Sequence, residues 1–280
     1  MRGRMILILA GREWRAALAA RWFWFYGGAT AALGAGLLWM ASGMIPAGVP
    51  ESLAGGRVLM ATVNLLALLV PLMGLTAGAQ CLAGERDRRT LGYLLAQPVT
   101  RSEILLGKLL GNGLALGAGL GGATLVLALA ALALAVPLPV TALLAVAGLG
   151  WLLALATMAL GAALGAGAPG LVAAQGALLV TWLLLVLLGD LSLMGLLMAK
   201  QHVPPQALLA LTFINPVHQF RVAAVALFRP SMEVLGPVGL YARERLGGAL
   251  VPVLAASLLV WTTGAVLVAL ERFQNSRSAS

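Results

Sequence analysis

The feature that most constrains this chain is a run of uncharged, mostly apolar residues at positions 109–189. Three further uncharged runs cover residues 22–50, 58–84 and 246–270. Each exceeds the roughly 20 apolar residues that a helix needs to cross about 30 Å of hydrocarbon. Only 10% of the residues are charged, whereas soluble domains hold about a quarter. The sequence therefore predicts a membrane protein and excludes an ordinary water-soluble domain.

The runs are rich in Leu, Ala and Gly and do not alternate, which predicts helices rather than a barrel. The longest run divides at the PLP of Pro137 and Pro139 and at the GAGAPG of residues 165–170. We predict an all-α polytopic membrane protein with residues 1–280 in one transmembrane domain. Its six crossings are expected at residues 22–44, 58–83, 108–135, 140–164, 171–194 and 248–270.

Residues 1–21 lack the long apolar core and the small-residue cleavage site of a signal peptide. Arginines alternate there with apolar residues, and tryptophans follow. We predict an amphipathic helix along the membrane surface, with a charged flank of the first crossing as the alternative. Its lipid-phosphate and interfacial anchors are expected to be Arg12, Arg15, Arg21, Trp14, Trp22 and Trp24.

Six crossings place both termini on one side. Of the 18 lysines and arginines, twelve then lie on that side, in the terminal segments, in the loop 85–107 and at Lys108 directly after it, and six lie opposite. Positive charge is retained in the cytoplasm, so both termini and this loop are expected to be cytoplasmic.

The longest opposite segment, residues 190–247, contains several prolines, so its helices must be short. Its stretch INPVHQFRVAAVALFRP predicts a helix capped by Asn215, with Pro216 in the first turn and an end at Arg229-Pro230. We expect it to dip back into the outer leaflet, because about a dozen apolar residues are too few for two further crossings. The expected apolar face is Val217, Phe220, Ala224, Val225 and Phe228.

Motifs for chemistry are missing. HExxH and GxSxG do not occur, and the nearest approach to a P-loop, residues 102–109, lacks its first glycine and final hydroxyl. We therefore predict no catalytic residues, no metal site and no cofactor in this chain. The net charge of +9 arises mostly from residues flanking the membrane spans, so anionic lipid rather than nucleic acid explains it.

Two sets of residues inside the spans leave alternatives open. Amide side chains in the spans could line a pathway or bond between helices, and they are Asn64, Gln80, Asn112 and Gln175. Methionines toward the outer half could carry Cu(I) or fill space, and they are Met40, Met44, Met60, Met194 and Met198. Glycines four residues apart predict close helix packing, within one copy or across a dimer, at Gly113, Gly117, Gly121, Gly161 and Gly165.

The loop 85–108, ERDRRTLGYLLAQPVTRSEILLGK, holds eight of the 27 charged residues. Leu91, Leu94 and Leu95 would share one face of a short helix that Pro98 stops. Thr100 or Ser102 can cap the helix that follows. An amphipathic helix rimmed by charge on the cytoplasmic side predicts a docking surface.

This loop resembles that of the permease subunits of ABC-2 type ABC transporters. The family pattern is a Glu, charged residues, Thr-Leu, Leu-Leu, Pro-Val, a hydroxyl residue, Arg and finally Gly-Lys. The family often has glycine where this chain has Arg89. The matching positions are Glu85, Thr90, Leu91, Leu94, Leu95, Pro98, Val99, Thr100, Arg101, Gly107 and Lys108.

The resemblance implies a homodimer in a bacterial inner membrane, with two copies of a separate ATPase subunit that bind ATP and Mg²⁺. The loop would be the coupling helix that fits a groove on the ATPase. The coupling residues implied are Glu85, Arg86, Asp87, Arg88, Arg89, Thr90, Leu91, Leu94, Leu95, Pro98, Arg101 and Lys108.

Residues 11–34 and 214–228 resemble a branch of this family that serves nitrous oxide reductase maturation. That branch implies a sulfur or copper species as cargo and a periplasmic accessory protein. A lipid, drug or peptide exporter, or a scaffold that transports nothing, is the alternative. The segment implied to meet the accessory protein contains Asn215, Pro216, His218, Phe220 and Arg221.

Overall fold

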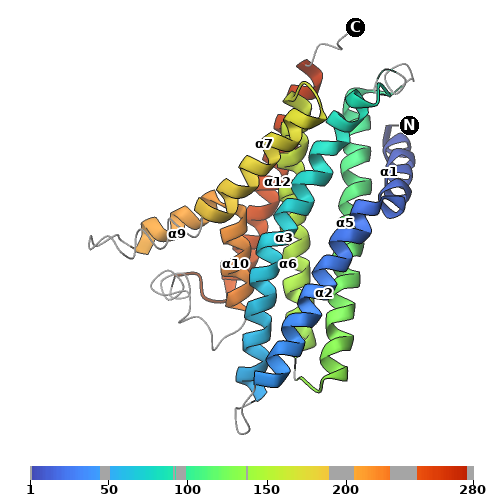
Figure 1. Cartoon of the computed structure of the whole chain (residues 1–280). Coiled ribbons are helices and arrows are strands. Elements are labelled where there is room, and N and C mark those ends of the chain that lie inside the picture. Colours follow the sequence, from blue (N-terminus) through green and yellow to red (C-terminus); the bar gives the residue numbers. More distant parts are fainter. Residues whose placement is uncertain are drawn as a thin grey trace.

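The computed structural model describes residues 2–44, 51–90, 92, 99–136, 138–188, 205–227 and 245–275. Every regular element in these ranges is helical (Figure 1), in agreement with the predicted all-α class. In chain order the helices are α1 (Arg2–Ala19), α2 (Arg21–Met44), α3 (Glu51–Asp87), α5 (Arg101–Ala133), α6 (Val140–Gly167), α7 (Leu171–Leu183), the π-helix η1 (Leu184–Leu188), α9 (Pro205–Ile214), α10 (Pro216–Ala226), the 3₁₀ turn η3 (Gly247–Ala249) and α12 (Leu250–Asn275).

Four helices in the described ranges are long and apolar enough to cross a membrane, in α3, α5, α6 and α12. They correspond to the second, third, fourth and sixth predicted crossings. α2 covers the first predicted crossing but is not among these four. The fifth begins as an apolar helix at Leu171–Leu187, and residues 189–194 lie outside the described ranges. Six crossings therefore remain a prediction.

The centre of the bundle is the contact between α3 and α6. Gly74 and Gly78 of α3 lie against the α6 backbone, and Gly161 and Gly165 of α6 lie against the backbone of Leu75 and Ala79. Without side chains at these points the two backbones approach closely, which increases the dispersion contacts that hold helices together in lipid. The sequence analysis named the two α6 glycines and missed the two on α3, although Gly74 and Gly78 have the same spacing.

The three glycines named on α5 have different surroundings. Gly113 O accepts a hydrogen bond from Trp151 Nε1 at 2.8 Å, and Gly117 also lies against the Trp151 indole. A Cβ at Gly121 would meet nothing within 4 Å. Packing within one copy therefore accounts for Gly113 and Gly117 but gives no role to Gly121.

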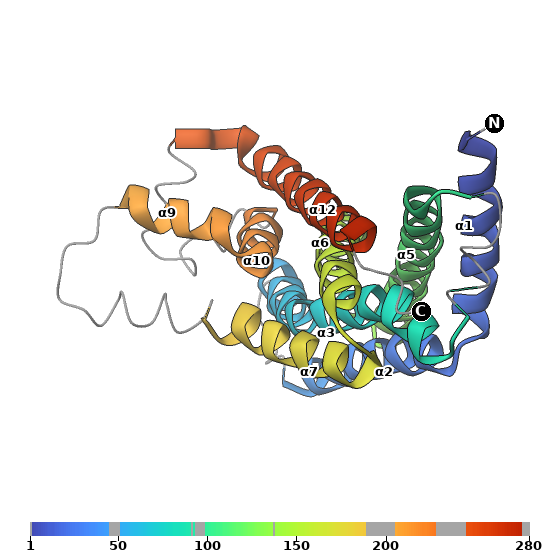
Figure 2. The same cartoon turned by 90° about the horizontal axis from the view of Figure 1, so that it is seen from above.

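α1 lies across one end of the bundle. Figure 2 looks down the bundle, so that α5 and α6 are seen end-on while α1 is seen from the side. It packs on α5 at two glycines, since a Cβ at Gly107 would lie 2.6 Å from Leu9 Cβ and one at Gly111 would lie 2.5 Å from Ala10 O. That α1 lies on the membrane surface stays a prediction, and its contact with α5 was not predicted.

α10 begins where the sequence analysis placed it. Asn215 Oδ1 accepts from Val217 N at 2.9 Å, and Pro216 opens the helix. The last helical residue is Ala226, while Phe228 and Arg229-Pro230 lie outside the described ranges. Most of α10 is buried against α3, α6 and α12. The buried side chains include the polar His218 and Gln219 as well as Phe220 and the other apolar residues.

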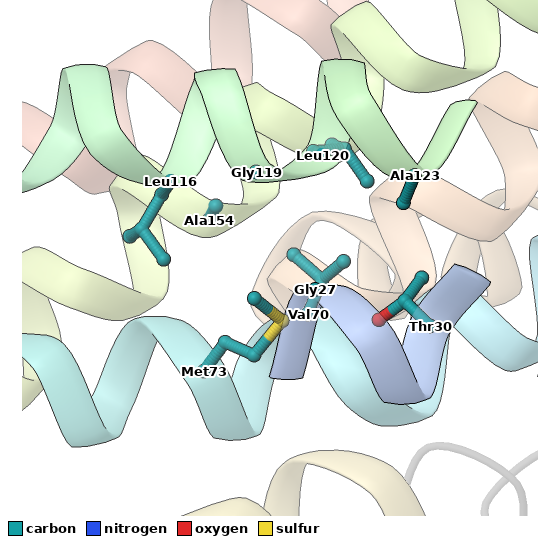
Figure 3. A pocket seen from close by; sticks show the side chains of 9 residues that line it. All are labelled: Gly27, Thr30, Val70, Met73, Leu116, Gly119, Leu120, Ala123 and Ala154. Atoms are coloured by element: carbon teal, nitrogen blue, oxygen red, sulfur yellow. The ribbon is translucent and has the colours of Figure 1, made fainter. Parts of the chain in front are cut away.

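The interior between α2, α3, α5 and α6 is closely packed. A cavity there has a volume of about 10 Å³. Figure 3 shows apolar side chains from Val70, Met73 and Leu116 in its wall. Thr30 is the polar side chain at this cavity, and its hydroxyl donates to Tyr26 O. Such a volume holds at most one water molecule, so this cavity is not a channel.

Candidate functional site

The two ends of the loop 85–108 are joined by partly buried charges. Lys108 Nζ on α5 lies 2.9 Å from Glu85 Oε1 on α3 and 2.9 Å from Glu13 Oε1 on α1. The Lys108 side chain is 4% exposed, and those of Glu13 and Glu85 are 14% and 17% exposed. Burial of an isolated ammonium costs free energy, and the two carboxylates offset this cost by pairing with Lys108. This Lys108 triad links three helices, and the sequence analysis missed Glu13.

Asn112 extends the same contact. Its Nδ2 donates to Lys108 O at 3.0 Å and lies 3.7 Å from Cys81 Sγ on α3. Of the four amide side chains predicted to lie in the spans, Asn112 thus bonds within the bundle. Gln80 is half-buried, and Asn64 and Gln175 lie on exposed faces of α3 and α7.

α3 ends in a turn centred on Arg89. Its φ is 57°, Thr90 N donates to Glu85 O at 3.0 Å, and Arg89 N donates to Arg86 O at 3.0 Å. This pair of bonds is the Schellman motif, whose left-handed residue is usually glycine because a side chain is disfavoured there. The Thr90 hydroxyl also donates to the Glu85 carboxylate. The turn thus forms with Arg89, at the position where the family that the loop resembles often has glycine.

α5 begins with a capping box at Thr100. Its hydroxyl accepts from Glu103 N at 3.3 Å, and the Glu103 carboxylate accepts from Thr100 N at 2.8 Å. Of the two caps considered from the sequence, the structure uses Thr100. The capping box satisfies two backbone donors at once and fixes the point where the loop enters α5.

Arg86 binds the end of another helix. Its guanidinium donates to Ala166 O at 2.9 Å, to Ala168 O at 2.7 Å and to Gly165 O at 3.4 Å. The last carbonyls of a helix lack intrahelical partners and carry partial negative charge, so a cation stabilises them. Arg86 therefore fastens the end of α3 to the end of α6.

Two further arginines make similar contacts to α12 and α6. Arg101 Nη1 donates to Phe273 O at 2.7 Å and to Gln274 O at 3.0 Å, and its guanidinium lies 5.6 Å from the Phe273 ring centroid. Arg272 Nη1 of α12 donates to Ala163 O of α6 at 3.1 Å. Helices far apart in sequence are thus tied together at the end of the bundle that carries the loop.

The coupling residues implied by the resemblance divide into three sets. Glu85, Arg86, Thr90, Arg101 and Lys108 make the internal bonds described above. Asp87, Arg88 and Arg89 are exposed at the tip of α3. Leu91, Leu94, Leu95 and Pro98 lie outside the described ranges, so the amphipathic helix predicted for them stays a prediction.

The segment implied to meet an accessory protein is enclosed where it is described. Asn215 donates to Leu185 O of η1 at 2.7 Å, and the residues that follow it in α10 pack into the bundle. Pro216, His218 and Phe220 are buried, and Arg221 is half-buried. These four side chains therefore build the fold around α10.

Comparison with known proteins identifies the family. The family described as ABC-2 family transporter protein matches residues 7–277. A protein of Pseudomonas aeruginosa named "Probable ABC transporter permease protein NosY" is 31% identical over 229 residues, 80% of this chain and 82% of the relative. A protein of the same name from Stutzerimonas stutzeri is 29% identical over 283 residues, 95% of this chain and 96% of the relative. Both relatives support the branch to which the sequence resemblance pointed. The chain belongs to the ABC-2 family of transporter proteins, as a membrane-embedded permease subunit of an ABC transporter.

Proposed function

We propose that this chain converts movements of a separate ATPase subunit, docked on the loop 85–108, into movements of its own membrane helices. The observation that carries the proposal is how the loop is fastened. The Lys108 triad ties it to α1, Arg86 ties it to α6 and Arg101 ties it to α12. A displacement of the loop therefore reaches five helices through short polar contacts, whereas a solvated linker would absorb it.

The docking surface itself consists of the exposed tip of α3, Asp87 to Arg89, together with the apolar residues that follow. Its charges are exposed, so a partner can pair with them without breaking the contacts inside the bundle. ATP and Mg²⁺ bind in the partner subunit, and two ATPases act on two copies of this chain. Coupling requires that the two conformations of the permease bind the ATPase with different affinity.

The proposed topology has six crossings in a bacterial inner membrane with both termini in the cytoplasm. α2 and the segment that begins with α7 supply the two crossings beyond the four apolar helices. In support, the start of α1, the end of α12 and the end of α3 lie toward the same end of the bundle (Figure 1), and most basic residues in the described ranges belong to these segments and to the start of α5.

We also propose a homodimer with the cargo path between the copies, and two exposed amides support it. Asn64 on α3 and Gln175 on α7 lie on outer faces of otherwise apolar helices. Polar groups facing hydrocarbon are costly, and a second copy or a hydrated path between copies removes that cost. The two relatives support the branch, and the resemblance to that branch implies the cargo that we propose, a sulfur or copper species for nitrous oxide reductase maturation, together with an accessory protein on the far side.

A binding assay tests the docking surface. The ATPase subunit proposed as the partner is titrated against the permease in nanodiscs, as wild type and as the Arg88→Glu/Arg89→Glu variant. Reversal of two exposed charges should weaken association at least tenfold at low salt. The Arg4→Glu/Arg15→Glu variant changes two exposed residues of α1, lowers the net charge by the same amount and serves as the control. Equal affinity of the ATPase for wild type and the double variant would refute docking at this tip.

A further inference from the structure

An apolar groove of about 430 Å³ lies between α6 and α12, in a part of the bundle that the loop does not use. Its walls come from Leu160 and Ala163 of α6, from Phe213 of α9 and from one face of α12. The groove is open to the surroundings, because Val260 and Val268 in its wall are 71% and 42% exposed. Its volume lies in the range of sites for small ligands, about 300–1,000 Å³.

The groove has the length of one leaflet. The α12 residues in its wall run from Ser257 to Val268 and recur every three or four positions, so they share one face. At 1.5 Å per residue this stretch rises about 17 Å, close to half of the roughly 30 Å hydrocarbon core. The polar groups at this face are the Ser257 hydroxyl and the Trp261 indole, and Trp261 Nε1 donates to Phe213 O at 3.0 Å.

A cation stands where the groove ends. Arg272 follows Val268 by four residues and so continues the same face of α12. It lies about 22 Å along the helix axis from Ser257. With Ser257 near the midplane of the bilayer, Arg272 is at the depth of the lipid headgroups. The Arg272 side chain is exposed, and its Nη1 donates to the carbonyl oxygen of Ala163, which lies in the groove wall. A guanidinium has five N–H donors, so donors remain for a phosphate. Glu271 is the neighbouring acid, about 100° around the helix.

We propose that this groove binds an anionic phospholipid, with an acyl chain between α6 and α12 and its phosphate on Arg272. The bound chain fills space that bare protein leaves open, and the phosphate pairs with an exposed cation at the matching depth. Arg86 and Arg101 bind the nearby ends of α6 and α12 and add positive charge at the same end of the bundle. The lipid proposal is separate from the docking proposal, because neither Arg272 nor any residue of the groove wall belongs to the loop 85–108.

Native mass spectrometry of the full chain in mild detergent tests the site, with phosphatidylglycerol and phosphatidylcholine of identical acyl chains as probes. We expect the wild type to bind phosphatidylglycerol at least fivefold more tightly. Arg272→Gln should remove this preference, and Arg4→Gln on α1 should keep it. Gly264→Leu should weaken both lipids, and it is compatible with the fold because a Cβ at Gly264 meets nothing within 4 Å.

Three results would overturn the proposal. The first is an unchanged preference in Arg272→Gln. The second is displacement of phosphatidylglycerol by millimolar inorganic phosphate, which would show that the headgroup alone is bound. The third is a wild-type dimer that Gly264→Leu converts to monomer without loss of lipid, which would make the groove a contact between copies.

Discussion

Lys108 Nζ and Glu85 Oε1 lie 2.9 Å apart, so one ion pair closes the base of the loop that runs between these two residues. Glu13 joins the same ammonium at 2.9 Å and brings α1 into the contact. The two carboxylates keep some contact with solvent, while the lysine has almost none. Loss of the ion pairs would therefore cost more free energy for the buried ammonium than for the carboxylates.

Replacing Lys108 with Met is therefore expected to destabilise the fold, because Glu13 and Glu85 would be left together without a cation. Removal of one partner from a buried charge pair costs about 3–5 kcal/mol, and the partial exposure of the carboxylates places this case at the lower end. The midpoint of thermal unfolding in detergent measures it. The neutral triple variant Glu13→Gln/Glu85→Gln/Lys108→Met should recover most of the loss, and a triple variant as unstable as Lys108→Met would contradict the charge argument.

Arg86→Ala should destabilise the contact between α3 and α6, because the carbonyls at the end of α6 lose their donor. Hydrogen bonds to a charged group contribute about 1.5–3 kcal/mol. Arg88→Ala, two residues along and exposed, is the matched control and should change stability by less than about 0.5 kcal/mol. Equal effects of the two substitutions on the unfolding midpoint would show that the α6 bonds contribute nothing.

Arg89→Gly should raise stability, because a left-handed residue with a side chain costs about 1 kcal/mol relative to glycine. Ala135 ends α5 in the same kind of turn, with a φ of 52°, so Ala135→Gly is the control for strain without a change of charge. Both variants should show a similar rise in the unfolding midpoint. Only Arg89→Gly should also weaken ATPase binding, and a drop in stability at both positions would disprove the strain.

Gly161→Leu should prevent close approach of α3 and α6, since its Cβ would collide with the Leu75 backbone. Gly121→Leu makes the same chemical change on α5, where a Cβ meets nothing within 4 Å. Size-exclusion profiles and yields in detergent should separate the two, with loss of folded protein only for Gly161→Leu. Matching yields would mean that the α3–α6 contact tolerates a side chain.

The elements of the fold that depend on local pattern were predictable. Uncharged runs are long enough to identify membrane helices without further information, and caps such as Thr100 and Asn215 are recognised by a hydroxyl or amide next to a helix start. The loop 85–108 was conspicuous because its charges stand between two apolar runs.

The tertiary contacts at this loop were not predictable in the same way. Arg86 and the carbonyls it binds are about 80 positions apart in the sequence. Every residue has a backbone carbonyl, so the residue type does not reveal which carbonyl accepts. Glu13 becomes the partner of Lys108 only because α1 lies on Gly107 and Gly111, whose four-residue spacing was the available signal. Some of the residues predicted for docking, such as Arg86 and Lys108, therefore also form bonds between helices, and their part in docking stays a prediction.

The most direct test of the account is ATP hydrolysis by the assembled transporter in nanodiscs, with wild-type permease and with the neutral triple variant of the Lys108 triad. The triple variant keeps Asp87, Arg88 and Arg89, so the ATPase should bind it with unchanged affinity. The account predicts that the permease-dependent increase in ATP turnover is lost in this variant, because the loop is no longer fastened to α1. A full increase in turnover, from a variant that is folded and binds the ATPase, would contradict the claim that the Lys108 triad transmits the motion.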